Sequence, residues 1–106
     1  MSVVDRELGF AYPDVVRLAG RVGGKTVGTC TLSLGTEVGA LYCIATHPEY
    51  RRRGIATALT GQALRITRES GRRIAALQAS SEGEPVYRNI GFETVAHYRL
   101  FQFPEA

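Results

Sequence analysis

The sequence lacks the features that mark several classes of protein. It has 106 residues, no tryptophan, two cysteines and two histidines. Two cysteines are too few for a disulfide scaffold, and Cys30 and Cys43 lack the spacing of metal ligands. Zinc needs more ligands than these cysteines and the distant His47 and His97 supply, so we expect no metal site. Both cysteines lie in apolar, strand-like runs, which favours reduced and buried side chains.

Long apolar runs are also missing. No stretch approaches the roughly 20 residues that span a bilayer, and the polar start of the chain is unlike a signal peptide. We therefore expect a cytoplasmic protein with no membrane partner. The hydrophobic (44%) and charged (22%) fractions are ordinary for a globular protein. A chain of this length is expected to form one domain, residues 1–106, with a modest core.

Positive charge is concentrated in one part of the chain. The net charge is +3. Seven arginines fall within residues 51–73: Arg51, Arg52, Arg53, Arg65, Arg68, Arg72 and Arg73. Such a cluster indicates an anionic partner, either a nucleic acid or a phosphorylated small molecule. The exposed aromatics that usually accompany nucleic-acid binding are absent from residues 51–73, which disfavours a nucleic acid.

The first half of the chain has the pattern of an antiparallel sheet. Residues 1–14 show no clear period, and we treat them as a lead-in without assigned structure. Alternating apolar residues predict strands over 15–22, 26–34 and 38–46. The segments Gly23-Gly24-Lys25 and Gly35-Thr36-Glu37 supply the turns between them. Three strands joined by short turns predict an antiparallel meander.

The second half alternates helices and strands. A helix is predicted over 53–70, with Thr60 away from its apolar face. That face repeats at helical spacing: Ile55, Leu59, Ala63 and Ile66. A short strand over 73–79, parallel to the third strand, a short helix over 85–90 and a closing strand over 92–103 follow. The predicted order is β-β-β-α-β-α-β, an α+β fold with a mixed, mostly antiparallel sheet of about five strands.

The stretch Ala40 to Thr57, ALYCIATHPEYRRRGIAT, joins a strand to a basic loop and the start of a helix. Free backbone N–H groups and the helix dipole favour a phosphate at such a place. Gly54 would allow a ligand to approach the backbone closely, and Ala56 is too small to obstruct it. Taken alone, this pattern also fits a solvated arginine cluster at the end of a surface helix.

Two motifs in this order resemble the GNAT superfamily of N-acetyltransferases. The family's Gln/Arg-x-x-Gly-x-Gly/Ala after a strand matches Arg51 to Ala56, and its later Tyr-x-x-x-Gly-Phe matches Tyr87 to Phe92. The resemblance covers about Leu18 to Phe101. It implies an acyl-CoA-dependent N-acyltransferase that transfers acetyl from acetyl-CoA to a primary amine by direct attack. A non-catalytic acyl-CoA-binding or regulatory module is the alternative.

The resemblance also implies roles for individual residues. The CoA would lie in a V-shaped opening between strand residues 41–46 and 74–79. Backbone groups of the first strand would hold the pantetheine arm and orient the thioester carbonyl: Ile44, Ala45 and Thr46. The loop and helix start would bind the phosphates: Arg51, Arg52, Arg53, Gly54, Ile55, Ala56 and Thr57. Ser80, where many relatives have asparagine, would make a polar contact. Tyr87 would be the general acid that protonates the departing thiolate; otherwise it is a core aromatic.

The acceptor side of the site is not evident in the sequence. The general base is left open among Glu37, His47, Glu49, Glu84 and a water relay. Complete family members carry a first strand and two helices before the meander, and those helices form much of the acceptor pocket. Only about 14 residues stand there in this chain. It would then be the cofactor half of a longer protein or a minimal version completed by a partner, and the uncovered sheet surface predicts a homodimer.

Overall fold

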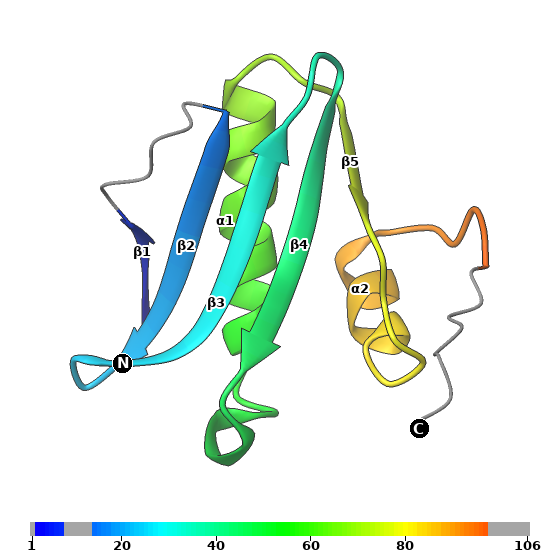
Figure 1. The fold of residues 1–106 in the computed structure, drawn as a ribbon. Coiled ribbons are helices and arrows are strands. Elements are labelled where there is room, and N and C mark those ends of the chain that lie inside the picture. Colours follow the sequence, from blue (N-terminus) through cyan, green and yellow to red (C-terminus); the bar gives the residue numbers. More distant parts are fainter. Residues whose placement is uncertain (1, 8–13, 98–106) are drawn as a thin grey trace, which may run out of the picture.

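The computed structural model describes residues 2–7 and 14–97, which form a five-stranded sheet with one long helix against it (Figure 1). The elements in chain order are β1 (Ser2–Glu7), β2 (Val15–Val22), β3 (Lys25–Leu34), β4 (Val38–Thr46), the 3-10 turn η1 (Pro48–Tyr50), α1 (Ile55–Glu69), β5 (Ile74–Leu77) and α2 (Glu84–Ile90).

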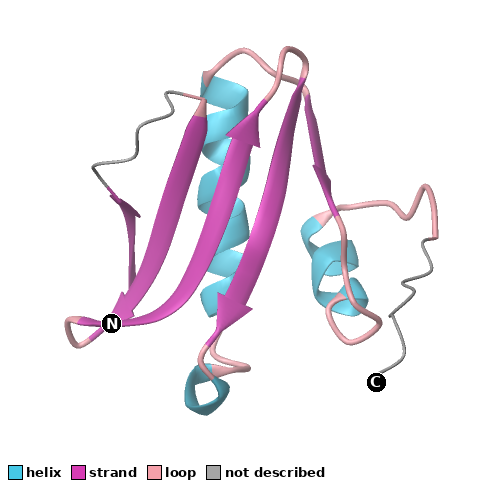
Figure 2. Cartoon of the chain, viewed as in Figure 1, coloured by secondary structure: helices cyan, strands magenta, loops and turns pink. Residues whose placement is uncertain are grey.

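The strands lie in the sheet in the same order as in the chain (Figure 2). The first four are antiparallel neighbours, and β5 runs parallel to β4 because α1 crosses between them. Gly23 and Gly24 have φ of 58° and 81°, the left-handed values that a two-residue hairpin turn requires. The predicted α+β class, the mixed five-stranded sheet and the parallel pair are confirmed.

The fifth strand is not the one predicted. Residues 1–14 had no assigned structure, yet Ser2–Glu7 form β1, which pairs antiparallel with β2. Its only apolar residues are Val3 and Val4, so the ladder with β2 rather than a local pattern makes it a strand. The predicted closing strand is not seen over residues 92–97, which have no regular structure. Its remaining residues, 98–103, lie outside the described part of the chain.

The core lies between the sheet and α1. Its buried residues come from three strands and the helix: Val16, Leu18, Val27, Cys30, Leu32, Leu41, Ile55, Leu59 and Ala63. Gly28 lets α1 approach the sheet, because a Cβ there would lie 2.8 Å from Ile55 Cγ2. Thr60, predicted to lie away from the apolar face, is fully buried. The helix also contacts α2, so more of its circumference is covered than one sheet would require.

The opposite face of the sheet is open in the described part of the chain, since α1 lies behind β2, β3 and β4 (Figure 1). By strand alternation this face carries Tyr42 and Ile74, each 54% exposed. Among the described residues, β4 is held mainly by its strand neighbours β3 and β5 and by α1.

Candidate functional site

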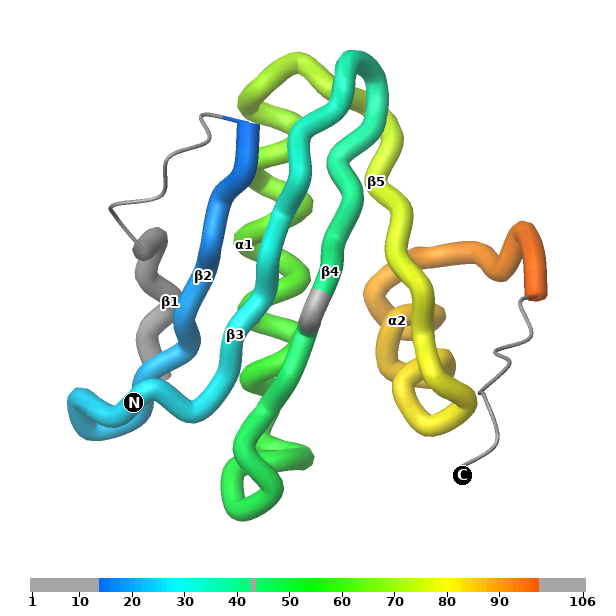
Figure 3. The backbone as a smooth tube through the Cα atoms, in the orientation of Figure 1, coloured from blue at the N-terminus to red at the C-terminus, as the bar shows by residue number. Residues whose placement is uncertain are grey.

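Strands β4 and β5 separate after a short paired segment. Residues Val38–Leu41 pair with Ile74–Leu77, and β4 then continues to Thr46 without β5 beside it (Figure 3). The backbone groups of this second half that point away from β3 therefore have no partner in β5. This agrees with the divergence of the two strands that the resemblance to the GNAT superfamily implied.

A bulge in β4 accompanies the separation. Thr31 pairs with Tyr42 and Thr29 pairs with Ala45, so residues 43 and 44 together stand opposite Cys30. An extra residue of this kind bends its strand and interrupts the regular ladder. The predicted pantetheine-binding residues Ile44, Ala45 and Thr46 all lie at or beyond this bulge.

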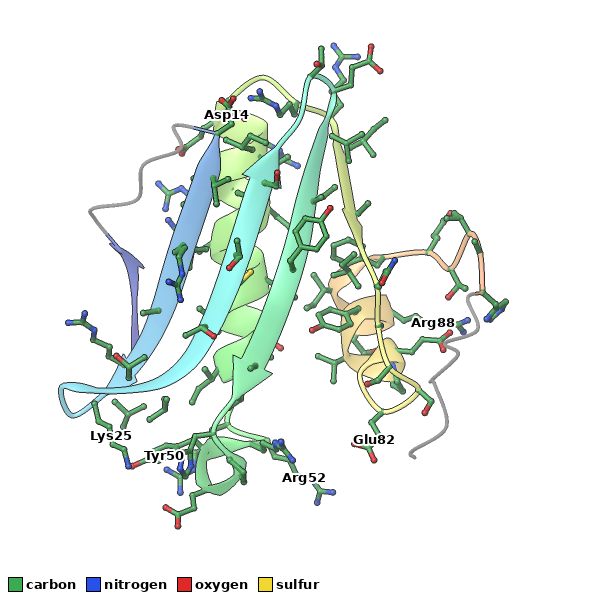
Figure 4. All side chains as sticks on the ribbon, in the orientation of Figure 1. Asp14, Lys25, Tyr50, Arg52, Glu82 and Arg88 are labelled. Carbon is green, nitrogen blue, oxygen red and sulfur yellow. The ribbon has the colours of Figure 1, made fainter. Side chains whose placement is uncertain are left out.

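The loop after β4 is organised around Tyr50, a residue that the sequence analysis did not single out. Its ring packs against the core, and the Arg53 guanidinium lies 5.1 Å from the ring centroid. Lys25 Nζ lies 5.7 Å from the same centroid, and the His47 ring meets it edge-on at 5.8 Å. Figure 4 shows Tyr50 and Lys25 at the same end of the sheet. A lone aromatic inside a basic loop was the sequence signal for this anchor.

The N-terminus of α1 has no internal partner for its first amides. Gly54 is the N-cap, with φ of 79° and no side-chain cap, and the first helical bond runs from Ala58 N to Gly54 O at 2.9 Å. Within the described residues, no group accepts a hydrogen bond from the N–H of Ile55, Ala56 or Thr57. No acidic residue lies in the first turn. The site therefore combines free donors with the positive end of a 15-residue helix dipole.

The three arginines before Gly54 are exposed and point in different directions. Arg51 Nε donates to Thr46 O at 3.4 Å, which ties the loop back to β4. Arg53 lies over Tyr50. Arg52 has φ of 63°, a left-handed value that costs a residue with a side chain about 1 to 2 kcal/mol. It projects away from Tyr50, on the side of the molecule that carries α2 (Figure 4).

Tyr87 lies on α2 and is partly buried. Burial raises the pKa of its hydroxyl above the ordinary value, and the nearby Cys30 thiol adds to the rise. The phenol is therefore protonated at neutral pH. Within the described residues its hydroxyl makes no hydrogen bond. Its ring meets Phe92 edge-on, with 6.2 Å between centroids and 82° between planes.

Ser80 has a structural role besides the predicted polar contact. Its Oγ accepts a hydrogen bond from Gly83 N at 3.2 Å, and its carbonyl accepts from Gly83 N and Glu84 N at 3.1 and 3.0 Å. These bonds form the turn that starts α2, and the hydroxyl hydrogen of Ser80 stays free to donate elsewhere.

The candidate bases do not converge on Tyr87. Glu84 Oε1 lies 2.8 Å from Arg88 Nη2 and accepts a hydrogen bond from Thr94 at 3.0 Å. His47 Nδ1 accepts the Glu49 N–H at 3.2 Å and so caps η1. Glu37 lies just before β4, at the end opposite the arginine loop.

Metal and membrane signals are missing from the part of the chain that the structure covers. Residues 2–7 and 14–97 contain no group of three or more histidines, cysteines or acidic residues that could hold a metal ion. The same residues include no helix that is long and apolar enough to cross a membrane.

The sequence matches a family model over most of its length. The model, described as an acetyltransferase (GNAT) domain, matches residues 18–95. The chain belongs to the GNAT acetyltransferase family. The matched residues run from β2 through α2, so they include the separated strands, the arginine loop and Tyr87. No curated protein sequence matches this GNAT chain.

Solved structures confirm the fold of this GNAT chain. An acetyltransferase from Trypanosoma brucei superposes with a TM-score of 0.73 at 25% identity, covering 87% of this chain and 70% of that one. Glucosamine-6-phosphate N-acetyltransferase from Arabidopsis thaliana gives 0.77 at 14% identity, covering 86% and 68%. A predicted acetyltransferase from Clostridium acetobutylicum, crystallised with acetyl-CoA, gives 0.71 at 20% identity, covering 84% and 64%.

Proposed function

We propose that this protein is an acetyl-CoA-dependent N-acetyltransferase that acts on a primary amine. The observation that carries the proposal is the junction of β4 and α1. The second half of β4 has a backbone edge without a partner in β5, and the chain then leads directly to the free amides of α1. An extended arm with amide groups fits the first feature, and a pyrophosphate fits the second. Coenzyme A has both parts in one molecule.

The residues present fit such a ligand. The N–H groups of Ile55, Ala56 and Thr57 would donate to the pyrophosphate, and Gly54 leaves room because nothing lies within 4 Å of its Cβ position. Bound acetyl-CoA would supply an activated acyl group as a thioester. The GNAT neighbour from Clostridium acetobutylicum, crystallised with acetyl-CoA, supports this choice of substrate.

Backbone groups and Tyr87 would assist the transfer itself. An N–H of the segment Ile44 to Thr46 would donate to the thioester carbonyl and stabilise the negative charge that develops on its oxygen. Tyr87 would donate its proton to the departing sulfur, for which it needs only to be protonated and within hydrogen-bond reach. Its raised pKa keeps it protonated across the neutral range. The amine loses its proton to solvent, directly or through an acidic side chain.

The proposal is tested by calorimetry followed by a turnover assay. We expect acetyl-CoA and CoA to bind with micromolar affinity, and thiol release from acetyl-CoA to require an amine. Absence of heat and of any thermal shift at millimolar CoA would refute the cofactor assignment. An amine panel then identifies the acceptor class, which the described residues leave open.

A non-catalytic acyl-CoA-binding module is the second candidate. It is favoured by the positions of Glu84 and His47, whose side chains are occupied in an ion pair and in a cap. Binding of acetyl-CoA without thiol release for any amine would establish this alternative.

We also propose that the protein self-associates, because the open sheet face carries the exposed side chains of Tyr42 and Ile74. A single monomer species in sedimentation at micromolar concentration would exclude a homodimer.

A further inference from the structure

Gly83 lies between two residues of the proposed site, Ser80 and Tyr87. Its N–H donates to Ser80 Oγ at 3.2 Å. A Cβ at position 83 would lie 3.2 Å from Tyr87 Cε2 and 3.5 Å from Ser80 Oγ. The first of these separations is shorter than the optimal distance between carbon atoms. The ring of Tyr87 therefore packs on the side where any other residue would carry its side chain.

The backbone does not require glycine at this position. Gly83 has φ of −81° and ψ of −23°, a right-handed helical conformation that every L-residue adopts. Gly54 and Gly91 differ, because their φ values of 79° and 125° exclude most other residues. The restriction at position 83 thus comes from the contact with Tyr87 and not from local geometry.

The Tyr87 ring has a second neighbour in Phe92. Phe92 meets the ring edge-on, and its N–H donates to Tyr87 O at 3.0 Å. The ring consequently has two close neighbours, the bare α-carbon of Gly83 and the Phe92 ring. Because a phenol ring is rigid, displacement at Cε2 moves the hydroxyl by a similar amount.

We propose that Gly83 is a positioning residue for Tyr87: by lacking a side chain, it lets the tyrosine ring lie against the turn at Ser80 and so sets where the hydroxyl stands. The catalytic part of this proposal rests on the proposed function. Proton donation requires a heavy-atom distance of about 2.6 to 3.2 Å, so a shift of a few tenths of an ångström affects the transfer step. Substrate binding through β4 and α1 does not involve this contact.

Kinetics of Gly83→Ala test the catalytic part. We expect kcat to fall about tenfold, in keeping with the cost of misplaced catalytic groups, while KM for acetyl-CoA changes less than twofold. Gly61→Ala is the matched control, since nothing lies within 4 Å of a Cβ at position 61, and we expect its kcat to equal that of the parent protein. A kcat for Gly83→Ala within twofold of the parent would overturn the positioning role.

A double-mutant cycle on thermal unfolding tests the contact without any assay of activity. Gly83→Ala is introduced into the parent protein and into Tyr87→Ala, where the ring is gone. We expect the change in Tm caused by Gly83→Ala to be more negative in the parent protein than in Tyr87→Ala, by about 4 °C or more. Gly83 is the N-cap of α2, and the different N-cap preferences of glycine and alanine contribute equally in both backgrounds, so they cancel in this difference. Equal shifts in the two backgrounds, or loss of folding in both, would refute the contact. If no amine supports thiol release, the proposed function fails, but this cycle still shows whether position 83 and the Tyr87 ring are in contact.

Discussion

The side chain of Thr67 lies directly over the α-carbon of Gly39, so that a Cβ at position 39 would be 2.7 Å from Thr67 Cγ2. Thr67 is buried, and its Oγ1 donates to Ala63 O at 2.8 Å, which leaves the methyl group and hydroxyl little room to move. This contact joins the C-terminal half of α1 to the start of β4. The bare α-carbon of Gly39 therefore lets this part of the helix pack closely against the strand.

Gly39→Ala should destabilise the protein by about 1 to 3 kcal/mol, the usual cost of overpacking a well-filled interior. Chemical denaturation would measure this change. Gly61→Ala, on an exposed position of the same helix, should instead stabilise the protein by about 0.5 to 1 kcal/mol. If Gly39→Ala were as stable as the parent, the close packing of Thr67 against Gly39 would be refuted.

Arg52→Gly should raise stability and lower affinity for CoA. Glycine adopts the left-handed φ without strain, so the substitution should raise the free energy of unfolding by about 1 kcal/mol. Loss of a guanidinium near the phosphates should weaken CoA binding about fivefold. Denaturation and calorimetry measure the two effects separately. A fivefold loss with CoA but none with dephospho-CoA would assign Arg52 to the ribose phosphate, and unchanged affinity for both ligands would remove it from the site.

Thr57→Glu should also move stability and binding in opposite directions. A carboxylate in the first turn of α1 interacts favourably with the helix dipole, worth about 0.3 to 1 kcal/mol. The same charge would repel a pyrophosphate, so we expect CoA affinity to fall at least tenfold. Thr57→Gln is the neutral control and should bind nearly as the parent does. Equal CoA affinity for the glutamate and glutamine variants would argue against phosphate binding at this helix end.

Tyr87→Phe should lower kcat by about 100-fold or more and leave the dissociation constant of acetyl-CoA unchanged, because only the proton donor is removed. Single-turnover measurements would separate the chemical step from product release. The phenylalanine keeps the ring contacts with Gly83 and Phe92, so its Tm should stay within a few degrees of the parent. Undiminished turnover would exclude the tyrosine as the acid.

The pH dependence of kcat should show no loss attributable to Tyr87 below pH of about 10. The active form is the protonated phenol, and its pKa is raised by burial. Activity that depends on this proton is therefore complete at neutral pH and declines only as pH rises through the raised value. An alkaline decline near pH 8 that disappears in Tyr87→Phe would contradict this assignment.

The parts predicted well from sequence were those with a strong local signal. Alternation of Val16 and Leu18 with charged residues located β2, and the glycine pair after Val22 located its turn. The candidate site was predicted from two motifs in order, and in the structure the separated strands lead into the free amides of α1. The roles of the individual residues stay predictions that the experiments above test.

The parts missed depend on contacts between distant segments. Strand β1 is defined by its ladder with β2, and its own residues, SVVDRE, carry too little apolar alternation to indicate it. Burial of Thr60 depends on what surrounds α1, which a helical wheel with one apolar face does not include. Tyr50 was overlooked because its partner Lys25 lies far from it in the sequence, at the start of β3.

The agreement between strand order and chain order has a consequence for folding. Each of β1 to β4 pairs with its immediate successor, so the meander forms through contacts of short sequence separation, which favours rapid folding. Only β5 must wait for α1 to cross the sheet, and its ladder covers four residues. We therefore expect amide protons of β5 and α2 to exchange faster than those of β2 and β3. Tyr87 would then belong to the segment that joins the native structure last and opens first.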